Sequence, residues 1–393
     1  MIPLTNRWAV LALMFLVGLN LPMQFQAVTA LAPFLVAEAG LGYTDIGVLT
    51  GLYMFPGIFL AAPSGLLAAA VGDRMTLALG VALMTAAALV FVLSDSYAVM
   101  FASRLVGGAG GVVITVFLPK IVADWFAGKE IATAQSIIAS SFGLGVGLAL
   151  AILPPIASLA SWKGAMLANA GVGVLAIVLL LALYRDHASG GARGAAAAPS
   201  RINQHEVVLS ALAGLGRGLF ASGYVVFMGF APALLIARGM ATTEAGLLTS
   251  LAAAVSLASV PLGGYLSDKL RRPNLFIVVG ALGTAASCAL IPEIAPALPW
   301  VLLFGLMRGG CTGGIMSLPV QVLRPESRRA GFAFASSMYF VCMAGFPAIA
   351  GYLLDMTAKP EIPLWFAAAL WLAIIAQLGS FKLLQRRWIP RRA

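Results

Sequence analysis

The sequence predicts an all-α membrane protein with twelve transmembrane helices in two six-helix bundles. Of its 393 residues, 61% are hydrophobic and only 10% are charged, against roughly 25% charged residues in an average soluble domain. Twelve apolar stretches are each long enough to cross a bilayer, which takes about 20 residues. A single long polar segment divides these stretches into two sets of six.

The twelve predicted spans follow one another with short connections. They cover residues 8–34, 44–68, 75–94, 97–119, 132–155, 163–184, 207–235, 243–266, 274–292, 298–319, 331–354 and 363–385. The polar interruption contains a low-complexity run at 190–199, a composition typical of flexible linkers. We therefore expect an N-terminal bundle at 1–184, a cytoplasmic linker at 185–206 and a C-terminal bundle at 207–393. The first apolar run lacks a small-residue cleavage site and is expected to be a retained span.

The basic residues predict the orientation. With the N-terminus inside, 18 of the 24 Lys and Arg residues lie on the cytoplasmic side, and only Lys163, Arg238 and Lys359 lie outside. Such a bias places both termini in the cytoplasm, and the expected location is the inner (plasma) membrane. The net charge of +10 is therefore mostly loop charge, and no nucleic-acid partner is expected because no basic cluster is interleaved with exposed aromatic residues.

The spans contain nothing that predicts an enzyme. No nucleophile–base pair, metal-ligand spacing or phosphate loop stands in them, so neither a metal nor a cofactor is expected. Cys288, Cys311 and Cys342 all fall in apolar stretches, and we interpret them as small packing residues rather than disulfides or ligands.

The two halves overlay without gaps at an offset of 199 residues. The matches, all from the first two spans of each half, are Ala32-Pro33 with Ala231-Pro232, Gly40 with Gly239, Thr44-Asp45 with Thr243-Glu244, Gly47 with Gly246, Leu49-Thr50 with Leu248-Thr249, and Gly65 with Gly264. They indicate a duplicated unit in which both copies have the same topology.

Three sequence patterns resemble those of the major facilitator superfamily. Residues 264–272 read Gly-Tyr-Leu-Ser-Asp-Lys-Leu-Arg-Arg, similar to that family's Gly-x-x-x-Asp-Arg/Lys-x-x-Arg/Lys loop. Span 4 carries Arg104 followed by Gly108 and Gly110, which resembles an Arg-x-x-x-Gly-x-Gly pattern, and span 10 repeats it loosely from Arg308. The resemblance implies alternating access by two bundles around a central site. Within the superfamily, the sequence looks most like the cyanate- and nitroimidazole-permease branch, with nitrate and oxalate/formate carriers as neighbours. The segment 120–126 contributes to this resemblance.

The resemblance also implies a gate on the cytoplasmic side. In the family, the loop Asp caps a helix of the other bundle and helps to hold that side shut, so Asp268, Lys269, Arg271 and Arg272 are predicted gating residues. In the first half, Ala69 and Ala70 stand where the Asp and a basic residue are expected. One latch of two is therefore predicted to be missing, which favours an inward-open resting state unless other contacts substitute.

Three permanent positive charges fall inside the predicted spans. All 14 acidic residues lie in loops or at helix ends, and both histidines lie in the linker region. A charge at mid-membrane costs several kcal/mol unless it is paired, and arginine does not lose its charge by deprotonation. Because the guanidinium fork suits planar or bidentate oxyanions, we expect a small anion as the substrate.

The three arginines have different expected roles. The resemblance implies that Arg104 braces span 4 against span 1, and substrate binding is the alternative. Arg308 is predicted at a similar depth in span 10, and both roles are open for it. Arg217 lies near the expected midplane without a pattern to explain it, opposite Gly18 in the overlay, and is predicted to bind substrate.

Polar residues near the same level complete the candidate substrate site. Spans 1, 4, 7 and 10 line the central cavity in the family, and Asn20, Gln24 and Tyr224 belong to these spans and are predicted substrate contacts. Gln24 and Gln26 are about 200° apart on a helix, so one of the two is expected to pack. Possible wall residues are Tyr53, Ser222, Ser336, Ser337 and Tyr339. Each could instead form an ordinary hydrogen bond between helices.

The predicted function is secondary active or facilitative transport of a small organic or inorganic anion. No Asp, Glu or His stands in the spans to relay protons, so exchange or uniport is expected, or protons carried with the anion. The alternatives are a multidrug or metabolite efflux pump, which usually has an acidic residue in its cavity, and a non-transporting receptor, which would predict a large extra domain. The expected partners are the anion and the lipid bilayer, and the chain is expected to act as a monomer.

Overall fold

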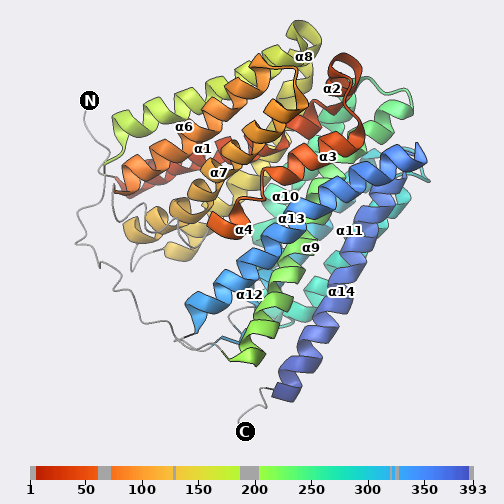
Figure 1. The fold of residues 1–393 in the computed structure, drawn as a ribbon. Helices are drawn as coiled ribbons and strands as arrows, with labels where there is room; N and C mark the ends of the chain where they lie inside the picture. The colour runs from red at the N-terminus through yellow and green to blue at the C-terminus, as the bar shows by residue number, and fades with distance from the viewer. Residues whose placement is uncertain are drawn as a thin grey trace. The chain divides into compact units, whose positions relative to one another are not determined.

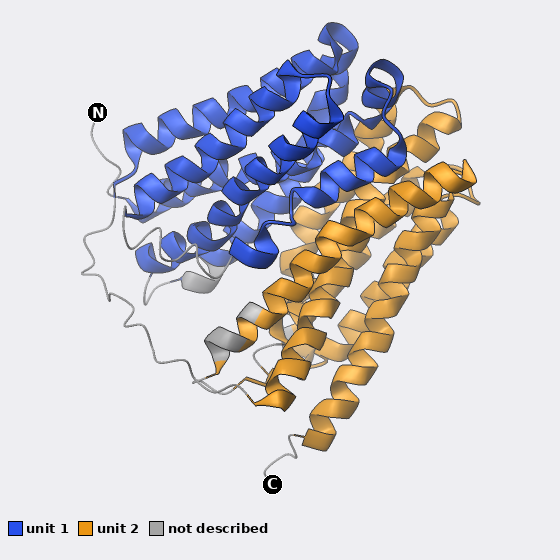
Figure 2. Cartoon of the chain, in the orientation of Figure 1, with its two compact units in different colours: residues 1–196 blue, residues 197–393 orange. Residues whose placement is uncertain are grey.

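The computed structural model describes residues 6–60, 72–126, 130–185, 203–318, 321–323 and 327–388. These residues fold almost entirely into helices (Figure 1). The chain divides into two compact units, 1–196 and 197–393 (Figure 2), which we call the N-terminal and C-terminal units. Their division falls within the predicted linker at 185–206, whose residues 186–202 lie outside the described residues.

The N-terminal unit contains seven labelled helices. They are α1 (Arg7–Ala30), α2 (Ala32–Ala39), α3 (Tyr43–Leu52), α4 (Gly57–Leu60), α6 (Asp73–Leu93), α7 (Tyr97–Trp125) and α8 (Ile131–Leu183). Helices α1 and α2 are two parts of the first predicted span, and α3 and α4 belong to the second. Helix α8 holds two spans, because the backbone leaves the helical conformation at Ala160 and Ser161. This unit therefore has six spans.

The C-terminal unit contains one helix for each predicted span. They are α9 (Gln204–Ala237), α10 (Thr242–Leu270), α11 (Pro273–Leu290), α12 (Leu298–Ser317), α13 (Arg328–Thr357) and α14 (Ile362–Trp388). Ten helices of the described chain are long and apolar enough to cross a membrane, with α8 counted once. Helix α12 is not among the ten, since Arg308 and five glycines interrupt its apolar residues. The predicted fold class, with twelve helices in two six-helix bundles, is confirmed.

The internal repeat is visible in local geometry. Gly40 ends α2 with a φ of 68°, and its counterpart Gly239 follows α9 with a φ of 88°. A residue with a side chain is strained in this left-handed region, whereas glycine is not. About two turns into the next helix, Thr50 Oγ1 donates to the Ile46 carbonyl and Thr249 Oγ1 to the Ala245 carbonyl, at 2.7 and 2.8 Å. The duplicated sequence therefore encodes the same helix–turn–helix twice.

Equivalent helices pack together in both units. Helix α6 packs on α7 as α11 packs on α12, and α1 packs on α8 as α9 packs on α13 and α14. Glycines allow the closest approaches, because a Cβ on Gly214 would stand 2.2 Å from the Ala335 carbonyl oxygen of α13. On its other side, a Cβ on Gly223 would stand 2.8 Å from Nε1 of Trp371 in α14. Helix α9 is thus held between α13 and α14, as Figure 1 shows.

Candidate functional site

Arg104 is a brace inside the N-terminal unit. It is 3% exposed and is the eighth residue of α7. Its Nε donates to the Leu49 carbonyl, and its Nη1 and Nη2 donate to the carbonyls of Gln24 and Phe25, all at 2.9 Å. Its Cζ also lies 4.2 Å from the centre of the Tyr53 ring. These contacts fix α7 to α1 and to the end of α3, where Leu49 belongs to the last turn, whose carbonyls lack helical partners.

Asn20 and Gln24 point into the N-terminal unit. Both are buried, one turn apart on α1. Nδ2 of Asn20 and Oγ1 of Thr85 lie 3.0 and 2.1 Å from the point that a Cβ on Gly173 would occupy. Nε2 of Gln24 donates to the Asn169 carbonyl at 3.4 Å. The structure therefore brings these two predicted substrate contacts against α6 and α8, together with Asn169, which the sequence reasoning missed.

Arg308 lies on aromatic rings of the C-terminal unit. It is 9% exposed, and its Cζ stands 4.0 Å from the Tyr224 ring centre and 5.0 Å from that of Phe220. Both rings belong to α9, whereas Arg308 belongs to α12. Its Nε is buried and has no hydrogen-bond partner among the described residues. Unlike Arg104, this guanidinium is held by ring faces.

Arg217 is held in a similar way. It is the fourteenth of the 34 residues of α9, and its Cζ lies 4.4 Å from the centre of the Tyr339 ring on α13. Its side chain is half-buried, and its Nε likewise has no hydrogen-bond partner in the described part of the chain. Ser222 stands two residues after Phe220 on α9. Its Oγ is buried and also has no hydrogen-bond partner among the described residues.

Both ring-held arginines lie beside one face of α9. Arg217, Phe220 and Tyr224 are three and then four residues apart, a spacing that aligns side chains along a helix. Because Arg308 lies over Phe220 and Tyr224, its guanidinium stands beside the face that carries Arg217. None of the ion pairs in the described chain includes Arg104, Arg217 or Arg308. Two positive charges of the C-terminal unit therefore lie beside this face of α9 without a described carboxylate partner.

The expected similar depth of Arg104 and Arg308 is wrong. Arg308 is the eleventh residue of α12, against the eighth residue of α7 for Arg104. Close glycine contacts with the preceding helices also place the two arginines differently. A Cβ on Gly108 would meet the carbonyl oxygen of Tyr53. A Cβ on Gly305 would meet the carbonyl oxygen of Ala252, which is the repeat counterpart of Tyr53. Arg104 precedes its contact glycine by four residues, whereas Arg308 follows Gly305 by three. The Arg-x-x-x-Gly-x-Gly sequence that starts at Arg104 and its loose repeat that starts at Arg308 therefore do not occupy equivalent positions.

The predicted gating residues lie at the end of α10 and in the turn that leads to α11. Helix α10 continues through Leu270, so Asp268 and Lys269 stand in its last turn and not in a loop. Lys269 is exposed, with its Nζ 5.7 Å from the Tyr265 ring centre. The chain turns at Arg271, which has a φ of 50°, and Arg272 precedes α11. The side chain of Asp268 lies outside the described residues, as do Ala69 and Ala70 of the first-half loop.

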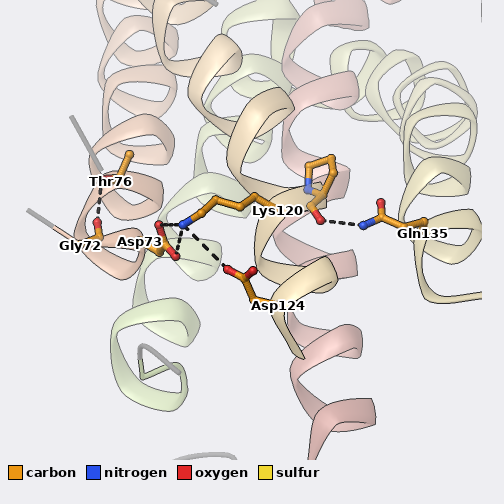
Figure 3. Close-up of polar contacts among 7 residues, drawn as sticks. Gly72, Asp73, Thr76, Lys120, Asp124 and Gln135 are labelled. Carbon is orange, nitrogen blue, oxygen red and sulfur yellow. Dashed lines mark hydrogen bonds and ion pairs between the residues drawn. The ribbon is translucent and has the colours of Figure 1, made fainter. Parts of the chain in front are cut away.

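The first acidic residue after that loop is bound within its own unit. Asp73 begins α6, and both of its carboxylate oxygens accept hydrogen bonds of 2.7 Å from Nζ of Lys120 on α7 (Figure 3). The same Nζ lies 3.9 Å from a carboxylate oxygen of Asp124. Beside them, Nε2 of Gln135 donates to the Pro119 carbonyl at 2.6 Å. This cluster ties α6, α7 and α8 together at one end of the N-terminal unit.

Comparisons with known proteins agree with this architecture. The family model described as Major Facilitator Superfamily matches residues 10–347 and 211–391. The 2-nitroimidazole transporter of Escherichia coli is 24% identical over 372 residues, covering 93% of each chain. The probable L-galactonate transporter of the same organism is 22% identical over 354 residues, which cover 81% of this chain and 77% of the relative.

Two further comparisons concern a third relative and a solved structure. The cyanate transport protein CynX of Escherichia coli is 25% identical over 303 residues, covering 76% of this chain and 78% of the relative. The inward-open structure of the xylose transporter XylE from E. coli superposes with a TM-score of 0.78 at 14% identity, covering 95% of this chain and 96% of that one. At this identity the structural likeness speaks for the fold alone.

Proposed function

Because this chain belongs to the major facilitator superfamily, we propose that it carries a small organic or inorganic anion across the inner membrane by alternating access. It is a multi-pass membrane transport protein, and its relatives carry names of transporters. In the proposed orientation, both termini lie in the cytoplasm, as the distribution of basic residues favours. The expected mode is exchange or uniport by a monomer.

One observation carries the proposal: Arg217 and Arg308 lie beside one face of α9 with no described carboxylate partner and with a buried Nε that lacks a hydrogen bond. Leaving a buried donor unsatisfied costs about 1–3 kcal/mol, and more for a charged group. A bound anion would satisfy both the donors and the charge. Stacking on rings leaves the edge of each guanidinium, where its N–H groups point, available for a ligand.

The other predicted contacts take different places in this proposal. Tyr224 stays in the site as the ring that holds Arg308. Arg104 is assigned to the brace, since its three nitrogens already donate to carbonyls. Asn20 and Gln24, which lie against α6 and α8, are assigned to the interior of the N-terminal unit.

A substrate panel tests this function. The full-length protein is reconstituted in proteoliposomes, and counterflow of labelled cyanate or L-galactonate is measured with unlabelled competitors. We expect saturable counterflow of at least one small anion, competition by other small anions, no competition by choline, and no change when a proton gradient is collapsed. Saturable transport of an organic cation, with every anion inert, would instead support the efflux alternative and overturn the anion proposal.

We also propose that Asp268, Lys269, Arg271 and Arg272 hold the cytoplasmic side shut. The family resemblance supports this role, together with the binding of Asp73 by Lys120, which leaves the first half without an equivalent free acid. If Asp268 caps a helix N-terminus, its charge contributes about 0.3–1 kcal/mol to closure. We expect Asp268→Asn to raise the labelling rate of a single cysteine placed at Gln321, with Asp124→Asn as the matched control. Equal labelling in both variants would contradict the gate.

A further inference from the structure

A small cavity lies inside the N-terminal unit, beside the brace. Its polar walls are Gln24, Tyr53, Ser103 and Arg104, and its apolar walls include Met84 and Met166. Its volume of about 10 Å³ corresponds to the space for one water-sized occupant. All of these residues belong to one unit, so the cavity is separate from the ring-held arginines of the other unit.

The Tyr53 hydroxyl is an unused donor at this cavity. Tyr53 is 3% exposed, and its Oη is buried without a hydrogen-bond partner among the described residues. Its ring is fixed, because a Cβ on Gly107 would stand 2.9 Å from Cε2 and a Cβ on Gly111 would stand 3.3 Å from Cε1. The hydroxyl therefore cannot turn elsewhere for a partner, and buried hydroxyl groups are nearly always hydrogen-bonded.

The charge beside the cavity favours a negative occupant. Arg104 has five N–H donors, and the described hydrogen bonds to Leu49, Gln24 and Phe25 use three of them. Carbonyl groups are neutral, so they satisfy donors but leave the net positive charge. Ser103 already donates its hydroxyl proton to the Met100 carbonyl. Besides the second N–H of the Gln24 amide, the remaining donors at this position are the Tyr53 hydroxyl and two guanidinium N–H groups.

We propose that this cavity, whose flexible Met84 and Met166 walls can give way to an ion slightly larger than water, binds one halide ion as a resident ligand that neutralises Arg104. A water molecule would accept the hydrogen bond of the hydroxyl but would leave the charge of Arg104 unneutralised. A halide would accept the hydrogen bond and also neutralise the charge. The occupant stabilises the N-terminal unit and is not the transported substrate. This site does not depend on the proposed anion site at Arg217 and Arg308.

The test is the thermal unfolding of the purified full-length protein in detergent, in sodium chloride or bromide against sodium gluconate at equal ionic strength. We expect either halide to raise the apparent Tm by about 2–6 °C, as a ligand of the native state does. Tyr53→Phe keeps the ring on the guanidinium but removes the donor, and should abolish the increment. Ala88→Val narrows the cavity from its apolar wall and should do the same without changing a polar group.

A double variant, Arg217→Gln with Arg308→Gln, is the matched control and should keep the full increment. Loss of the halide effect in this control would place the ion at the transport site and overturn the inference. The inference also fails if the wild type shows no halide effect, or if both Tyr53→Phe and Ala88→Val retain that effect. If Tyr53→Phe lowers the Tm equally in halide and gluconate, the occupant of the cavity is water, and the inference fails as well. A bromide-soaked crystal should show an anomalous peak in contact with Tyr53 Oη.

Discussion

Arg308→Gln is expected to reduce saturable anion uptake into proteoliposomes by about 30-fold or more. Removing one partner of a buried, hydrogen-bonded charge pair costs about 2–5 kcal/mol, and each 1.4 kcal/mol is tenfold in affinity. Glutamine keeps a polar N–H group but is shorter than the lost side chain and brings no charge. Arg308→Lys should show an intermediate loss, because an ammonium keeps the charge without the planar fork that lies on Phe220 and Tyr224.

The controls distinguish the effect of losing a residue of the anion site from the effect of replacing an arginine elsewhere in the same unit. Arg238 belongs to the same unit, and its guanidinium donates to the carbonyls of Ile291 and Pro292. Arg238→Gln should leave the uptake rate per folded protein within about two-fold of the wild type, as expected when no ligand contact is lost. The ring itself is tested by Tyr224→Leu against Tyr224→Phe, and only the first should weaken uptake. Uptake by Arg308→Gln equal to that of Arg238→Gln would remove Arg308 from the site.

Arg104→Met is expected to lower the stability of the folded protein by about 3 kcal/mol or more. Hydrogen bonds to charged groups contribute about 1.5–3 kcal/mol each, and this change removes three of them together with the contact to the Tyr53 ring. For a unit of about 200 residues, such as the N-terminal unit at 1–196, 1 kcal/mol corresponds to about 2–4 °C. Size-exclusion chromatography after heating in gluconate should therefore show a drop of about 6–12 °C in apparent Tm.

Arg217→Met is the matched comparison, because the described contact of that guanidinium is a ring and not a carbonyl. Its apparent Tm should fall by no more than about 4 °C, since an exposed or partly exposed cation–π contact contributes about 0.5–1 kcal/mol. Its uptake should nevertheless be lost. Equal thermal losses in the two variants, or normal stability of Arg104→Met, would contradict the division into a brace and a site.

Much of the fold could be predicted from the sequence, because a membrane helix is recognisable from its long stretch of apolar residues. The overlay of the two halves also anticipated matched turns, and Gly40 and Gly239 do adopt the same left-handed conformation. The exact ends of the helices were harder to predict. Asp268 and Lys269 were expected in a loop because they match the family's loop pattern, but α10 runs through both of them. The turn at Ala160 and Ser161, by contrast, falls between two predicted spans as expected.

The candidate site was only partly predictable, for a physical reason. An arginine in an apolar stretch is visible in the sequence, but its partners lie on helices far along the chain. The carbonyls of Leu49 and Phe25 carry no side-chain signal at all, and Phe220 looks like any other apolar residue. The depth of Arg308 was misjudged because a glycine can meet a neighbouring helix at any turn, and in α12 the equivalent contact is made by Gly305.

The ring-held arginines have an electrical consequence. A charge moved through the whole membrane potential changes the energy by about 2.3 kcal/mol per 100 mV. If Arg217 and Arg308 form the substrate site, the empty carrier presents two positive charges to that field, and a bound monovalent anion leaves one. The empty and loaded forms then differ in their response to voltage, so the membrane potential acts differently on the loaded and empty steps, and each complete cycle of uniport carries one negative charge across the membrane.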